Sequence, residues 1–143
     1  MFKQIKNNKG FTLVEVIVVA VIVLILAAVA IPLYNNYIRD SRKSTASNAA
    51  ASIATFMGVA TQVGSSITTD VTARSWKTAE VEGAEGFGGE TSIVCPAGHS
   101  CSVASGEVTV SHCRDTQNAT TTVRFGARNP LGTITAFECA GAD

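Results

Sequence analysis

Charged and aromatic side chains are scarce in this sequence. Only 15% of the residues are charged, the formal net charge is zero, and aromatic residues make up 6%. A nucleic-acid-binding protein that relies on a basic surface needs clustered Lys and Arg, so this composition excludes that class. The charge is also unevenly placed, because Lys3, Lys6 and Lys9 precede the first acidic residue. The remainder of the chain therefore has an excess of acid.

The sequence also lacks a recognisable set of catalytic or metal-binding residues. No C-x-x-C pair occurs, and the spacing of the cysteines with His99 and His112 fits no common structural zinc pattern. The glycine-rich stretch 83–89 has no Gly-Lys-Ser/Thr ending, so it is not a phosphate-binding loop. We expect no enzyme activity, no cofactor and no metal. Both histidines are expected at the surface or in turns, and Trp76 in local packing.

What the sequence has in abundance is a long apolar segment near its beginning. From Phe11 to Ile31 only Thr12 and Glu15 interrupt the apolar residues. As a helix this segment is roughly 31 Å long, which matches the hydrocarbon thickness of a bilayer, and a lone strand could not satisfy its backbone there. Two plain interpretations are a single-pass membrane anchor and a secretory signal peptide cut after Ala30.

Glu15 argues for a third interpretation. A carboxylate in a membrane helix costs a few kcal/mol at the centre and less near an interface, and such residues usually have a function and a partner. If the chain were cut between Gly10 and Phe11, a new amino group would lie four residues before Glu15, roughly 6 Å along a helix. That amine could neutralise the carboxylate of a neighbouring copy. Glu15 would then be costly in an isolated subunit and satisfied on assembly.

The N-terminal segment resembles the prepilin signature of the type IV pilins and of the pseudopilins of type II secretion systems. The matching residues are Lys9-Gly10-Phe11-Thr12-Leu13-Val14-Glu15, followed by an apolar run to Ala30-Ile31-Pro32. The resemblance implies that Gly10 precedes the prepilin peptidase cut and that Phe11 becomes the N-methylated first residue. It implies that Glu15 registers the incoming subunit against the growing filament. Pro32 matches a proline that kinks the long helix, and Tyr34 and Tyr37 match aromatic residues that follow it.

The same resemblance implies an organisation and a cellular context. It predicts a leader peptide over residues 1–10, a transmembrane and filament-core helix over 11–38, an amphipathic continuation over 39–64, and a disulfide-bonded globular head over 65–143. The implied partners are other copies of the chain, related pilins, prepilin peptidase and the inner-membrane assembly machinery. The subunit would sit in the bacterial inner membrane with its N-terminus cytoplasmic, and later in an extracellular or periplasmic filament.

Two features near the apolar segment modify this expectation. Many pilins have a helix-weakening glycine within the apolar run, and Leu24 occupies that position here. Local melting of the helix before Pro32 is therefore less expected, although a proline still removes one hydrogen bond and favours a kink. Basic residues flank the segment on both sides, so charge alone does not fix its orientation. Those on the far side are Arg39, Arg42 and Lys43.

The helix is predicted to continue well beyond the apolar segment. Apolar residues recur in steps of three and four, which is typical of one buried helix face. Gly64-Ser65-Ser66 is a plausible end, so the helix should run from about Thr12 to Val63, with Phe56 and Met57 in the core. The recurring residues are Ala46, Ala49, Ala50, Ile53, Phe56, Met57, Ala60 and Val63.

The last third of the chain shows strand patterns. We predict strands over Glu107–His112, Thr120–Phe125 and Thr133–Cys139, the last after a turn at residues 129–132, and no sustained period over Ile67–Gly89. Short consecutive strands of this kind form an antiparallel meander with one face on the helix. The predicted fold class is α+β, pilin-like, with a long N-terminal helix packed on a small antiparallel sheet.

The cysteines indicate an oxidising compartment. An even number of cysteines in a small exported domain favours two disulfides, and pilins often close their C-terminal region in this way. Three connectivities are open, and we favour Cys95–Cys101 with Cys113–Cys139. The second bond would contribute about 3 to 4 kcal/mol on the chain-entropy model.

The leading hypothesis is a structural subunit of a type IV pilus or pilus-like filament. A type II secretion pseudopilin is the nearest alternative, and the C-terminal cysteines and the lack of an Asp-rich calcium loop favour a pilin over it. A secreted, disulfide-bonded binding domain released after Ala30 is an alternative from another class. The sequence leaves open whether the subunit is major or minor and what the head binds.

Overall fold

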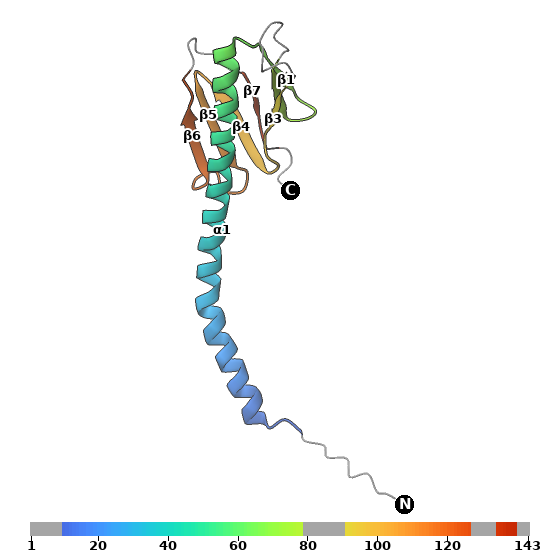
Figure 1. Cartoon of the computed structure of the whole chain (residues 1–143). Helices are drawn as coiled ribbons and strands as arrows, with labels where there is room; N and C mark the ends of the chain where they lie inside the picture. The colour runs from blue at the N-terminus through green and yellow to red at the C-terminus, as the bar shows by residue number, and fades with distance from the viewer. Residues whose placement is uncertain (1–9, 79–90, 127–133, 140–143) are drawn as a thin grey trace, which may run out of the picture. The chain divides into compact units, whose positions relative to one another are not determined.

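The fold consists of one long helix and two small antiparallel sheets (Figure 1). The computed structural model describes residues 10–78, 91–126 and 134–139. The leader before Gly10, the glycine-rich stretch 83–89 and the turn at 129–132 lie outside the described residues. The chain divides into two compact units, Met1–Tyr37 and Ile38–Asp143. The predicted α+β class, with a long N-terminal helix and a small antiparallel sheet head, is confirmed.

Helix α1 extends over Leu13–Val63, in agreement with the predicted range. Thr12 caps its first turn, because the Glu15 N–H lies 3.3 Å from the Thr12 hydroxyl oxygen and 3.1 Å from the Thr12 carbonyl oxygen. A threonine followed three residues later by a glutamate is a recognised helix-start pattern. Glu15 also places a negative charge in the first turn, where the helix dipole favours it.

Gly64 ends α1. Its φ of +77° lies in the left-handed region, which costs glycine nothing because glycine has no Cβ. The Ser65 N–H then donates to the Ala60 carbonyl at 3.0 Å. This bond pattern satisfies a carbonyl that the last helical turn would leave unpaired.

The later half of α1 packs on the sheets through the predicted apolar stripe. Met57 is fully buried, and Phe56 packs against the edge of the core. Small alanine side chains on the same face let the helix lie close to the strands. The buried helix residues are Ala46, Ala50, Ile53, Ala54, Met57 and Ala60.

Sheet A contains three short strands in the order β1-β2-β3. The sequence did not predict any of them, because three or four residues are too few for a two-residue alternation to show. The lack of a sustained period over Ile67–Gly89 therefore concealed two of these strands. The strands are β1 Ile67–Asp70, β2 Ser75–Thr78 and β3 Ser92–Val94.

Sheet B contains four strands in the order β6-β5-β4-β7. Figure 1 shows its strands beside the later part of α1. The prediction of β5 is confirmed at both ends, β6 and β7 are shorter than predicted, and β4 was not predicted. The strands are β4 His99–Ala104, β5 Glu107–His112, β6 Thr120–Arg124 and β7 Ile134–Phe137.

The strand order corrects the predicted meander. Strand β7 pairs with β4 rather than with its predecessor β6. Strand β5 lies between β4 and β6, so one side of β4 is left to pair with β7. A two-residue turn, Ser105-Gly106, joins β4 and β5 with φ values of +51° and +80°. Two successive positive φ values are typical of the type I′ turn that suits a twisted hairpin.

The core lies between α1 and the inner faces of the sheets. Residues alternate between buried and half-buried along β4, and Val103, Val108 and Val110 are fully inside. Trp76 from β2 is also fully buried, and its ring lies 4.7 Å from that of Phe137 in β7. Trp76 is thus a packing residue, as expected, and it connects the two sheets.

Candidate functional site

The most extensive exposed surface in the described chain is the apolar first half of α1. Phe11 is 82% exposed and Leu24 is 68% exposed, and nearly every side chain between them is similarly uncovered. Exposed apolar surface of this extent marks a contact with lipid or with another protein. By length and composition α1 could cross a membrane, which on its own is weak evidence because signal sequences pass the same test.

The predicted processing residues lie just before this helix. Gly10 and Phe11 are both exposed, and both precede the Thr12 cap. Apart from its chain neighbours, no described residue has an atom within 4 Å of the position that a Cβ on Gly10 would take. The peptide bond between Gly10 and Phe11 is therefore outside the hydrogen-bonded helix.

Glu15 is exposed in the first turn of α1. Its backbone N–H is held by Thr12, and among the described residues its carboxylate forms no ion pair. Sequence reasoning singled out Glu15 but missed the capping role of Thr12. The signal was present as the Thr-x-x-Glu spacing.

Pro32 lies inside α1, and the helix continues through it. Without an N–H, Pro32 cannot donate to the carbonyl of Ala28, so one hydrogen bond of the helix is missing there. A kink at Pro32 remains a prediction. Tyr34 and Tyr37, which follow the proline, are both largely exposed.

Four cysteines form two disulfides in the unit that begins at Ile38. Cys95 bonds to Cys101 and Cys113 bonds to Cys139, with sequence separations of 6 and 26 residues. This is the pairing favoured from the sequence. The first bond is buried, whereas both cysteines of the second are half-buried. Because the cysteines are oxidised in this arrangement, they offer no thiolates for a zinc ion.

The histidines are not surface or turn residues as expected, and this prediction is corrected. His99 opens β4 and is only 4% exposed, and His112 closes β5 and is half-buried. They face each other in the strand register with ring centroids 4.9 Å apart. No sequence pattern revealed this contact, because β4 itself was not predicted.

Arg74 connects the two sheets. Its guanidinium donates to the Glu138 and His99 carbonyls, each at 2.7 Å, and lies 5.7 Å from the centre of the Phe137 ring. The same group is 3.6 Å from the sulfur of Cys95. Arg74 adopts a φ of +50°, which is uncommon for a residue with a side chain.

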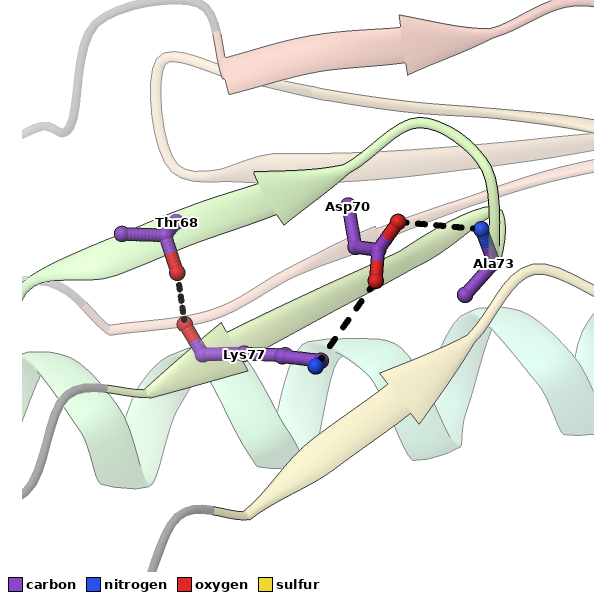
Figure 2. Close-up of polar contacts among 4 residues, drawn as sticks. All are labelled: Thr68, Asp70, Ala73 and Lys77. Atoms are coloured by element: carbon purple, nitrogen blue, oxygen red, sulfur yellow. Dashed lines mark hydrogen bonds and ion pairs between the residues drawn. The ribbon is translucent and has the colours of Figure 1, made fainter.

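The turn that presents Arg74 is fastened by Asp70, as Figure 2 shows. The Asp70 carboxylate accepts the Ala73 N–H at 3.1 Å and lies 3.7 Å from the Lys77 ammonium. The Ala73 hydrogen bond is the largest cause that lowers the pKa of Asp70; burial opposes it, and the charge of Lys77 adds to the lowering. Thr68 adds a longer hydrogen bond, 3.5 Å, to the Lys77 carbonyl.

The fold and the uncovered helix agree with the class predicted from the sequence. A long N-terminal helix, apolar and exposed at its start and packed on small antiparallel sheets later, is consistent with the α+β fold of pilins. Residues 5–31 match the family model of the prokaryotic N-terminal methylation motif. The resemblance to the type IV pilin family predicted from the sequence is confirmed over this segment.

Individual relatives are similar to a part of the chain. It is 48% identical over 50 residues to a fimbrial protein, EcpC, of Eikenella corrodens, covering 35% of this chain and 31% of that protein. It is 57% identical over 37 residues to the type IV major fimbrial protein FimA of Dichelobacter nodosus, covering 26% of this chain and 24% of that protein. The matches thus span a third or less of these curated relatives. No solved structure matches the chain significantly.

Proposed function

We propose that the chain is a structural subunit of a type IV pilus or pilus-like filament, processed by prepilin peptidase and polymerised through its N-terminal helix. The observation that supports this most strongly is the exposed apolar first half of α1 with one acid, Glu15, in its first turn. Such a surface is unstable in water, so it needs lipid before assembly and other copies of the same helix afterwards.

Processing would fit the local structure. A cut between Gly10 and Phe11 removes the Lys-rich leader but leaves the Thr12 cap and the helix intact. The new amino group of Phe11 would carry a positive charge four residues before Glu15, just ahead of the start of α1. In an array of parallel helices that charge also reaches the Glu15 carboxylate of a neighbour. N-methylation of Phe11 retains the charge, so this pairing would persist.

The membrane location follows from the same helix. Before assembly α1 would hold the subunit in the bacterial inner membrane with its N-terminus in the cytoplasm, where the leader meets the peptidase. After assembly the unit beginning at Ile38 would form the outer surface of an extracellular or periplasmic filament. Related pilins and the inner-membrane assembly machinery would be its partners.

The alternatives are less well supported. A signal peptide cut after Ala30 would require cleavage inside the continuous helix Leu13–Val63. The two C-terminal disulfides favour a pilin over a major pseudopilin. We propose no catalytic activity, since the head's polar clusters serve to hold the sheets together.

Replacing Glu15 tests the proposal. We expect Glu15→Ala to leave peptidase processing intact but to reduce the sheared filament fraction by about tenfold or more, because the amine of the neighbouring subunit loses its partner in an apolar layer. Glu15→Asp should retain part of the assembly, and Val18→Leu, on the same helix, should assemble normally. The readout is an immunoblot of sheared filaments against membranes. Normal filament incorporation of Glu15→Ala would refute the proposal.

A further inference from the structure

Two imidazole rings meet at one end of sheet B on its buried face. His99 and His112 have the same strand parity as the buried Val103, Val108 and Val110. The Cys113 N–H donates to the Gly98 carbonyl at 2.9 Å, so the next pair, His99 with His112, is a non-hydrogen-bonded pair. Side chains in such pairs approach each other most closely. The rings contact edge to face, with centroids 4.9 Å apart.

The hydrogen bonds around the pair indicate which nitrogen of each ring carries a proton. His99 Nδ1 lies 3.1 Å from the Ala97 carbonyl, so it carries the proton, and its Nε2 is buried with no hydrogen-bond partner among the described residues. His112 Nδ1 accepts the Arg114 N–H at 3.2 Å, so the proton of that ring sits on Nε2. These tautomers do not present two lone pairs to one metal ion. A proton added at His112 Nδ1 would instead point at the Arg114 N–H and break that hydrogen bond.

The charges facing His112 come from three elements. Among the described residues, His99 on β4, Arg42 on α1 and Arg114 in the turn after β5 disfavour a positive charge there, whereas Asp115 favours one. Burial is the largest influence, and together these groups lower the pKa of His112. An unfolded histidine takes up a proton near about pH 6.5, before the folded one does. The folded state therefore loses stability as the pH falls below that value.

We propose that the His99–His112 pair is an acid-sensitive latch that holds this end of the β4–β5 hairpin closed while His112 is neutral and releases it when His112 is protonated. Release breaks the Arg114 hydrogen bond and sets a new cation against Arg42. The Cys113–Cys139 disulfide adjoins His112 and keeps the opened segment tethered. The buried valines and the Ser105-Gly106 turn hold the other end of the β4–β5 hairpin closed. The opening is thus local and reversible, and it is independent of filament assembly.

Hydrogen–deuterium exchange of the full chain in detergent micelles tests the latch. Exchange is measured at about pH 7.5 and about pH 5.5, on either side of the ordinary histidine value, and corrected for the intrinsic pH dependence of amide exchange. We expect the corrected rates in peptides covering 96–100 and 110–114 to rise severalfold at the lower pH. Peptides covering 103–108 should not change. Equal corrected rates in the latch peptides at both pH values would overturn the proposal.

Three variants identify the group responsible. His112→Asn keeps an oxygen acceptor for the Arg114 N–H but cannot become charged, so it should abolish the acid response. Arg42→Gln removes a repelling cation and should shrink the response, whereas Arg39→Gln, on the same helix, should not. An undiminished response in His112→Asn would overturn the latch. If that variant does not fold, equal responses in Arg42→Gln and Arg39→Gln would overturn it instead.

Discussion

At the scale of single residues, Arg74 connects the two sheets, although nothing in the sequence around it indicates this role. It is presented by a turn of sheet A and reaches two carbonyls that belong to β4 and to the residue after β7. The His99 acceptor belongs to a buried residue and the Glu138 acceptor to an exposed one. Hydrogen bonds from a charged donor are among the stronger ones in proteins. We therefore expect Arg74 to stabilise the fold beyond an ordinary surface arginine.

Replacing Arg74 by asparagine should destabilise the protein by about 1 to 3 kcal/mol, because two carbonyl oxygens lose their donor. Asparagine tolerates the left-handed backbone conformation, so the effect reports the guanidinium rather than the backbone. The measurement is denaturant unfolding of the full chain in detergent, followed by tryptophan fluorescence of Trp76.

Arg124 provides the matched control for this measurement. Its side chain is 85% exposed and forms an ion pair with Glu107 at 2.6 Å. Exposed ion pairs contribute little, so Arg124→Asn should change the free energy of unfolding by less than about 1 kcal/mol. Equal losses from the two variants would show that Arg74 is only another surface charge.

Single residues also show where sequence reasoning fails. Phe56 and Met57 were placed correctly in the core because helical periodicity fixes which side of α1 they occupy. His99 was misplaced because its burial depends on the pairing of its strand with β5, and its neighbours in sequence do not reveal this pairing. Arg74 gave no signal for the same reason, since its acceptors lie 25 and 64 residues further along the chain.

At the scale of elements, the long-range disulfide fastens the end of β7 to the end of β5. Cys139 follows β7 and Cys113 follows β5, so this bond joins the two strands that flank β4. Edge strand β7 has only β4 as a neighbour. A covalent tie limits its loss from the sheet.

Removing this disulfide with Cys113→Ser and Cys139→Ser together should lower the free energy of unfolding by about 3 to 4 kcal/mol, the value expected for closing a loop of this size. Removing the Cys95–Cys101 disulfide should increase the entropy of the unfolded state less, because that bond closes a shorter loop. Serine at these two buried positions would, however, also place polar hydroxyl groups in the core. Denaturant unfolding of the full chain measures both. A loss below about 1 kcal/mol for the Cys113–Cys139 pair would contradict the entropic role.

The elements differ in how well the sequence predicts them, and length is the physical reason. Helix α1 repeats its pattern over many turns, and both of its ends have clear signals, Thr12 and Gly64. Strands β5 and β6 alternate over five or six residues and were predicted. Strands of three or four residues, such as β1 and β3, hold together only through their partners. The position of β7 beside β4 likewise depends on tertiary pairing.

At the scale of the whole molecule, the two compact units differ in whether their apolar side chains are exposed or buried. The unit ending at Tyr37 exposes its apolar side chains, whereas the unit beginning at Ile38 has its own core and two disulfides. The family model of the methylation motif covers residues 5–31, within the first unit, and the relatives match 37 to 50 residues of the chain. The second unit would then determine the surface chemistry of the filament.

The most direct test of the proposed function is mass spectrometry of the N-terminal peptide of the native protein. Our account predicts a methylated chain that begins at Phe11. A chain that begins at Ile31 would instead show a conventional signal peptide and a soluble exported domain. An intact Met1 would show an ordinary anchor that prepilin peptidase does not process, and either of these two results would contradict the account.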